Sequence, residues 1–135
     1  MEREYENERL PRWQAWYDLC VGRLLLQSVR LEEYRVTIRM IDDPRGFPRK
    51  ANEIRLFPYA TIRSGEKSLQ RAVEGQRLLH RCLEKNPGTP WAFLAARELE
   101  HPVSVDFNWR YIPPPPPAPP GRSISPGPSI SIPKL

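Results

Sequence analysis

The chain has 135 residues, 17 of which are proline, and a formal net charge of +5. No apolar run approaches the ~20 residues that a membrane helix needs, and the charged start lacks the apolar segment of a signal peptide. As written, the sequence therefore predicts a cytoplasmic protein without a membrane span. Ten prolines follow residue 112. We expect a charged extension at 1–9, a helical domain at 10–112 and a disordered tail at 113–135.

The first predicted element is one long helix from about residue 10 to residue 41, because residues 12–43 contain no proline. Large or apolar residues recur there at steps of three or four, with Gln27 as the one polar interruption. These residues are Trp13, Tyr17, Cys20, Leu24, Leu31, Tyr34, Ile38 and Ile41. In the first half of the helix the stripe is widened by Trp16, Leu19, Val21, Leu25 and Leu26, so we expect that half to be buried on more than one side and the second half on one side only. We expect this burial to stabilise the helix. Gly22 is expected to let a second helix approach closely.

A basic loop is predicted at residues 44–64. Two prolines and a glycine within 44–48 end the long helix. Ile54, Leu56 and Ile62 alternate loosely with polar residues in the loop, which allows short extended pieces, but Pro58 limits their pairing. From residue 44 to residue 67, six basic residues stand against two acidic ones. Such a loop attracts phosphate or acidic protein surfaces, or is simply a solvated surface loop. The residues considered for polyanion contact are Arg45, Arg49, Lys50, Arg55 and Arg63.

Two shorter helices are predicted near 66–86 and 90–100. Pro87 and the glycine after it stop the first of them. Thr89 is expected to be the N-cap of the second, with Pro90 in the first turn, where the missing amide hydrogen costs nothing. The side chains expected to build the core between these helices and the long helix are Trp13, Trp16, Trp91 and Leu94.

Residues 103–111 alternate between apolar and polar side chains with a period of two, which is the pattern of a β-strand. The rest of the chain offers no strong strand partner. We therefore expect either an extended segment laid over the helices or an edge that awaits a partner. The side chains expected to dock a protein partner are Val105, Phe107, Trp109 and Tyr111. In the tail, the run from Pro117 to Arg122 suits either a groove that binds polyproline II or, in our preferred interpretation, a stiff spacer.

Groups for catalysis are sparse. His80 and His101 are the only histidines, and neither lies beside a nucleophile pattern. The sequence holds no glycine-rich phosphate loop, no Cys/His ligand spacing and no pattern of paired carboxylates. Cys20 and Cys82 fall among apolar helical positions, which favours buried free thiols; a disulfide between them is the alternative. The sequence therefore predicts a protein that is not an enzyme and that has no cofactor or metal.

Two resemblances add to this interpretation. The run from Trp91 to Ala95, preceded by Pro87, resembles the join between tetratricopeptide helices, although the period of about 34 residues is not met. The runs 12–19 and 87–92, with 97–99, resemble the C-terminal region of large bacterial proteins that carry a von Willebrand factor type A-like domain. That resemblance spans 12–112 and implies a remnant or fragment of such a protein. The A-type domain is lacking here, and with it the Asp-x-Ser-x-Ser metal site, so no metal function follows.

The predicted fold is mainly α. It is a small helical bundle, or a tetratricopeptide-like helix hairpin packed on one long helix, with a short extended segment and a disordered proline-rich tail. The first hypothesis for function is a non-catalytic protein-interaction or structural module with a protein partner. The alternative is polyanion or nucleic-acid binding through the basic loop at 45–63, where Phe47, Phe57 and Tyr59 could stack on bases.

Overall fold

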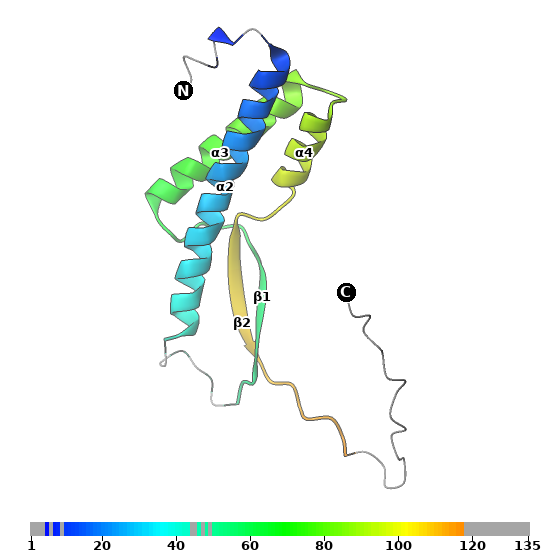
Figure 1. The fold of residues 1–135 in the computed structure, drawn as a ribbon. Coiled ribbons are helices and arrows are strands. Elements are labelled where there is room, and N and C mark those ends of the chain that lie inside the picture. The colour runs from blue at the N-terminus through cyan, green and yellow to red at the C-terminus, as the bar shows by residue number, and fades with distance from the viewer. Residues whose placement is uncertain are drawn as a thin grey trace, which may run out of the picture.

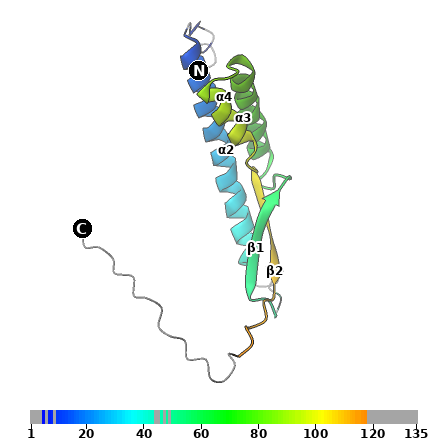
Figure 2. The same cartoon turned by 90° about the vertical axis from the view of Figure 1, so that its right-hand side faces the viewer.

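The computed structural model of the chain describes residues 5, 7, 8, 10–43, 46, 48 and 50–117. The elements follow in the order α2, β1, α3, α4 and β2. Helix α2 runs along the molecule, with α3 and α4 beside one half and the two strands beside the other half (Figures 1 and 2). The fold is mainly helical with one small sheet, as the sequence predicts.

Helix α2 spans Pro11–Ile41, close to the predicted bounds. The face that it buries is not the predicted one. The buried residues are Ala15, Asp18, Leu19, Gly22, Leu26, Val29, Glu33 and Thr37. The predicted stripe lies on the opposite side of the helix, where Leu24 is 69% exposed. The prediction that burial of the main stripe holds α2 is therefore wrong, whereas Leu19 and Leu26, which were expected to widen the buried face, are buried.

The predicted core needs the same correction. Trp16 is 53% exposed, and Trp13 and Leu94 are also exposed. Trp91 alone of the four packs against the core, and it is only partly buried. The buried core consists mainly of small and aliphatic side chains, namely Ala15, Leu19, Leu26, Val29, Ala72, Leu79, Cys82 and Ala95. Large aromatic side chains are excluded because the helices approach too closely to admit them.

The close approach occurs where α2 crosses α3, which spans Glu66–Lys85. A Cβ atom added to Gly22 would lie 3.0 Å from the carbonyl oxygen of Gly75 and 2.8 Å from Cγ of Leu79. A Cβ on Gly75 would in turn lie 3.0 Å from the carbonyl oxygen of Gly22. The two glycines thus bring the backbones together, and the prediction that Gly22 admits a second helix is confirmed.

Helix α4 spans Pro90–Leu99 and forms a hairpin with α3. Its start follows the prediction, because the Thr89 hydroxyl oxygen accepts a hydrogen bond from the amide of Ala92 at 3.3 Å and Pro90 occupies the first turn. Gly88 in the preceding turn has φ of 74°, a conformation that favours glycine. Local sequence signals therefore determine this hairpin.

The strands correct a second prediction. Strand β1 spans Glu53–Tyr59 and pairs in antiparallel fashion with β2, Ser104–Arg110. The alternating segment thus has a partner, and it comes from the region predicted as a loop. Pro58 is tolerated because β1 is an edge strand of a two-stranded sheet. The other edge of the sheet faces α2, where the Thr37 hydroxyl donates to the carbonyl oxygen of Val105 at 3.1 Å.

The two ends of the chain differ in how far they join the fold. Tyr5, in the segment predicted as an extension, is only 7% exposed. Its hydroxyl donates to Asp18 at 3.2 Å, and the Arg81 guanidinium lies 3.9 Å from its ring centroid. Residues 113–117 form neither helix nor strand, and the rest of the predicted tail lies outside the described residues.

Candidate functional site

Buried acidic side chains join the elements. Glu33 of α2 is 1% exposed. Its Oε1 accepts hydrogen bonds from the amides of Arg63 and Ser64 at 2.9 and 2.7 Å, and its Oε2 accepts from the Ser104 hydroxyl at 2.5 Å. One carboxylate therefore connects α2, the segment before α3 and the start of β2.

Two further carboxylates are held by arginines. Asp18 of α2 binds the Arg81 guanidinium of α3 through several contacts, one of 2.5 Å. Glu98 of α4 contacts Arg30 of α2 and also Arg23, which is 3.2 Å away. Buried charges need such partners, because an unpaired charge would be costly to remove from water. These three clusters are connections between elements.

The protonation of two of these acids follows from their partners. Burial alone would raise the pKa of Glu33, but the hydrogen bonds from Ser104 and from the Ser64 and Arg63 amides outweigh it and lower the pKa. Burial likewise opposes ionisation of Glu98, and the hydrogen bonds and charges of Arg30 and Arg23 lower its pKa. Both carboxyls stay ionised near neutral pH and are poor general acids there.

The two cysteines are free thiols. Cys82 is fully buried, and burial together with the charge of Asp18 raises its pKa to about 11. Its thiol lies 3.5 Å from the carbonyl oxygen of Ala15. Cys20 is only partly buried, on α2. The expected burial therefore holds for Cys82 and in part for Cys20, and the alternative of a disulfide between them is wrong.

Three of the four side chains predicted for docking share one face of the sheet. Val105, Phe107 and Trp109 alternate along β2 and therefore point to the same side. The rings of Phe107 and Trp109 meet edge to face, with centroids 5.9 Å apart. Val105 is buried, whereas Tyr111 lies beyond the end of β2 and is exposed. Tyr111 therefore lies at the margin of this face.

Strand β1 adds side chains that the sequence alone does not single out. Ile54 lies opposite Trp109 and Leu56 lies opposite Phe107. Both side chains are exposed, Leu56 by 48%. The alternation of apolar residues in 53–59 was the available signal, but Pro58 argued against a strand there. We call Ile54, Leu56, Phe107 and Trp109 the apolar sheet face.

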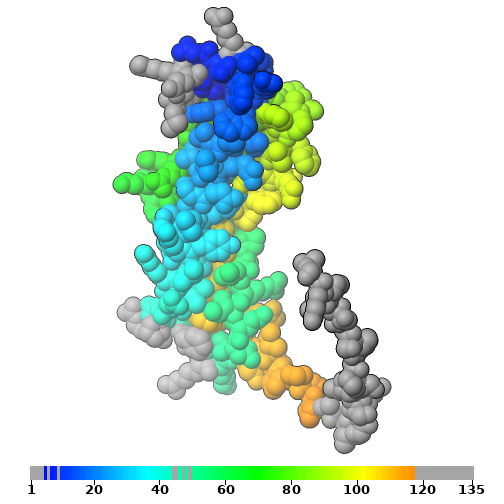
Figure 3. All heavy atoms as spheres, in the orientation of Figure 1, coloured from blue at the N-terminus to red at the C-terminus, as the bar shows by residue number. Residues whose placement is uncertain are grey.

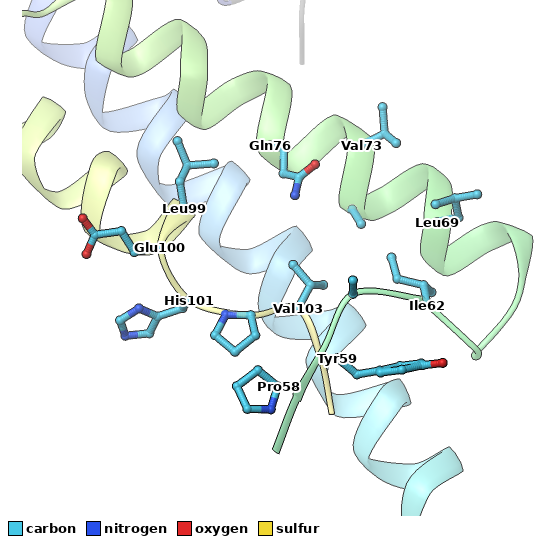
Figure 4. Close-up of a pocket in the computed structure, with 13 residues that line it drawn as sticks. Pro58, Tyr59, Ile62, Leu69, Val73, Gln76, Leu99, Glu100, His101 and Val103 are labelled. Atoms are coloured by element: carbon cyan, nitrogen blue, oxygen red, sulfur yellow. The ribbon is translucent and has the colours of Figure 1, made fainter. Parts of the chain in front are cut away.

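A groove of about 640 Å³ lies between α3, the end of α4 and the adjoining ends of the strands. Figure 4 shows Leu69 and Val73 lining it from α3, and both are exposed. Glu100 and His101 lie at one end of the groove, with Tyr59 on the strand side. Most of the lining is apolar, so the groove extends the exposed apolar surface.

Among the basic residues considered for polyanion contact, Arg63 is engaged within the fold. Nη1 of Arg63 lies 3.0 Å from Asp106, and its Nη2 donates to the carbonyl oxygen of Val105 at 2.6 Å. Its guanidinium carbon also lies 5.0 Å from the ring centroid of Tyr59. These contacts are internal, so Arg63 stabilises the junction of β2 with the rest of the fold.

Two of the remaining basic residues, Lys50 and Arg55, are exposed. Arg45 and Arg49 lie outside the described residues, as does Phe47.

Within the part of the chain that is described, no three His, Cys, Asp or Glu side chains lie close enough together to hold a metal ion. None of the described helices is long and apolar enough to cross a membrane.

No protein-family model matches this chain, and no curated protein or solved structure matches it either.

Proposed function

We propose that the protein is a non-catalytic protein-interaction module and that a protein partner docks on the apolar sheet face. The observation that carries this proposal is the exposure of large apolar side chains on a two-stranded sheet. Ile54 and Leu56 project from β1 beside the partly buried rings of Phe107 and Trp109. Aromatic residues are enriched in protein interfaces, where they supply contact area at low entropic cost.

The surroundings of this face support the same proposal. Tyr111 continues the apolar surface past the end of β2, and the groove lined by Leu69 and Val73 lies at the other end of the sheet. Soluble monomers rarely expose contiguous apolar patches of more than a few hundred Å² unless the patch binds something. The exposed side chains at this end of the molecule therefore support a binding role.

The state of the ionisable groups supports a role without catalysis. Asp18, Glu33 and Glu98 are buried and already occupied by donors from other elements. Enzymes generally hold at least one acid, base or nucleophile in a cleft with a pKa suited to proton transfer. In the described residues, the acids with resolved shifts have lowered pKa values, and the one thiol with a resolved shift has a raised pKa.

The test compares two neighbouring residues of β1 that point to opposite faces of the sheet. Leu56→Asp places a charge on the apolar sheet face, and Arg55→Asp places one on the other face. Tagged full-length chains would be purified from cells that naturally contain the protein, and co-purifying proteins quantified by mass spectrometry. We expect Leu56→Asp to lose a partner that the wild type and Arg55→Asp both retain.

Equal thermal midpoints of the two variants serve as the control for folding. Trp109→Ala provides a second variant on the same face. An unchanged set of partners in both Leu56→Asp and Trp109→Ala would refute the proposed docking surface.

We also infer the wider setting from the two resemblances in the sequence. A tetratricopeptide-like packing of α4 with its neighbours suits a scaffold for protein partners, since such repeats bind through their surfaces. A relationship to the region after an A-type domain would attach this module to a larger protein in bacteria. A reading frame for an A-type domain directly upstream in the same genome would support that relationship.

A further inference from the structure

The outer face of α2 carries a continuous stripe of large apolar side chains. Figure 3 shows the side chains of α2, coloured blue to cyan, uncovered along most of the length of the molecule. The stripe consists of Trp13, Tyr17, Cys20, Leu24, Gln27, Leu31, Tyr34, Ile38 and Ile41. Most of these side chains are about half exposed or more. At the two ends of the stripe, the Tyr17 ring lies 5.5 Å from the ring of Tyr5 and Tyr34 borders a pocket shared with the strands, whereas Leu24, Leu31 and Ile38 are exposed.

The spacing of the stripe is that of a helix pair. From Trp13 to Ile41 the steps alternate between four and three residues without a break. This period of 3.5 is the seam of a left-handed coiled coil, in which each side chain packs between four residues of a facing helix. The opposite face of α2 already holds α3 and β2, so a facing helix has to come from outside the described fold.

We propose that this stripe is the contact surface of a homodimer, in which α2 packs in parallel and in register against α2 of a second copy. A second copy supplies a helix of the same length with the same spacing. It also places every position of the stripe opposite its own counterpart. Two-fold dimers of this kind are the commonest form of oligomer among soluble proteins.

The area available suits a stable dimer. Helix α2 has 31 residues, a length of about 46 Å at the usual rise per residue. Trp13 and Tyr34 of the stripe, and Trp16 beside it, each expose about half of their surface, so each can bury about half of the roughly 150–250 Å² of an aromatic side chain. Together with the exposed Leu24, Leu31 and Ile38, they supply a large part of the roughly 800 Å² per partner of a standard specific interface.

Gln27 determines the relative orientation of the copies. It is the one polar position in the middle of the stripe. In a parallel, in-register pair, the two Gln27 amides face one another and can exchange hydrogen bonds. In an antiparallel pair with the same seam, Gln27 would face Leu24 or Leu31 and lose this partner. A single polar position is a known means of fixing register in coiled coils.

The charges beside the stripe are compatible with this pairing. In the parallel pair, Arg30 of one copy approaches Arg35 of the other. Within its own chain, Arg30 contacts Glu98, and Arg35 lies 2.8 Å from Glu32. Each guanidinium therefore brings its own carboxylate to the seam, which reduces the repulsion between copies.

The first experiment measures the mass of the full chain by sedimentation equilibrium at tens of micromolar. We expect a dimer for the wild type. Leu24→Arg should weaken dimerisation by about 100-fold or more, because each copy would bury an uncompensated guanidinium at the seam. Arg39→Ala, on the exposed part of α2 outside the stripe, should leave the dimer intact. Since Leu24 is 69% exposed in the single copy, we expect the circular dichroism spectrum of Leu24→Arg to stay helical.

The second experiment tests the register through Cys20. In the parallel pair the two Cys20 thiols face each other, and the oxidant diamide takes up their two protons and two electrons as a disulfide forms. We expect a covalent dimer on a non-reducing gel for the wild type and for Cys82→Ser, but not for Cys20→Ser. Cys82 is fully buried and should not contribute.

Each result bears on the proposal. A monomeric wild type, or a dimer that Leu24→Arg leaves unchanged, would overturn the assignment of the stripe. A dimer that depends on Leu24 but forms no Cys20 disulfide would overturn the parallel register. The dimer is tested by the mass of the purified chain and the docking surface by the set of co-purifying proteins, so failure here is distinguishable from failure of the proposed docking surface.

Discussion

The two faces of α2 do not divide simply into an apolar buried face and a polar exposed one. The inner face combines Leu19, Leu26 and Val29 with Asp18, Gly22 and Glu33 and is buried. The outer face holds tryptophan, leucine and isoleucine side chains and is exposed. The inner face is buried because two glycines let α3 approach and because distant residues provide hydrogen-bond partners for its polar groups. Burial within one chain therefore follows from the contacts that other elements provide, and the exposed apolar face is the one on which we propose that a second copy packs.

The largest expected effect comes from removing a buried partner on the inner face. Glu33→Ala leaves the Ser104 hydroxyl and the amides of Arg63 and Ser64 without their acceptor. We expect a loss of about 3 kcal/mol in the free energy of unfolding, measured by chemical denaturation. Glu32→Ala is the matched control. The Glu32 side chain, next to Glu33 in the sequence, makes only an exposed ion pair with Arg35, and such a pair is worth about 0–1 kcal/mol. Equal losses would contradict the distinction between the faces.

A second prediction concerns the close approach of the helices. Gly22→Ala should destabilise the protein by about 1–2 kcal/mol, since overpacking against Leu79 and the Gly75 carbonyl outweighs the gain in helix propensity. Gly46→Ala is the control, because a Cβ there meets nothing closer than 3.6 Å. Thermal midpoints of both variants provide the measurement. A more stable Gly22→Ala would show that the helices separate easily.

The buried carboxylates also predict a dependence on pH. The pKa values of Glu33 and Glu98 lie below the ordinary value of 4.5, so the folded protein holds their protons less tightly than the unfolded chain. Their stabilisation is present above pH 4.5 and is lost as the pH falls through the folded pKa values. Urea midpoints should therefore fall between pH 5 and pH 3. Glu33→Gln should show a shallower dependence, and an identical slope would argue against this role.

The smallest effect is expected on the outer face. Ile38→Gln should change the free energy of unfolding by only about 0.5 kcal/mol when copies are separated by dilution, because Ile38 is half exposed. Its neighbour Thr37 is buried and donates to the Val105 carbonyl oxygen, so Thr37→Val should cost more despite the smaller change in polarity. Denaturation at low and high protein concentration measures both variants. A larger loss for Ile38→Gln in dilute protein would reverse the comparison.

Local signals in the sequence were sufficient for the helices. The absence of proline in 12–43 and the Thr89 cap gave the bounds of α2 and the start of α4 to within a residue or two. Such features depend on neighbours in the chain. The three helices α2, α3 and α4 could therefore be predicted without knowledge of the tertiary contacts, but the faces by which they pack could not.

Features that depend on distant residues could not be predicted in this way. The apolar stripe of α2 indicated the wrong face, because Gly22 is buried by a glycine 53 positions away, Gly75. The pairing of β1 with β2 was missed because Pro58 argued against a strand, and only the edge position makes it acceptable. Phe107 and Trp109, which we propose for docking, were selected by their alternation, and the structure adds their neighbours from β1.

The Glu33 cluster has a consequence for the order of folding. Its three hydrogen bonds span 30, 31 and 71 positions of sequence, so they form only after long segments of chain have been brought together. Contacts of such separation tend to form late, whereas the α3–α4 hairpin closes over a few residues. We therefore expect loss of this carboxylate to accelerate unfolding and to leave the folding rate nearly unchanged, so that Glu33 governs the lifetime of the native state.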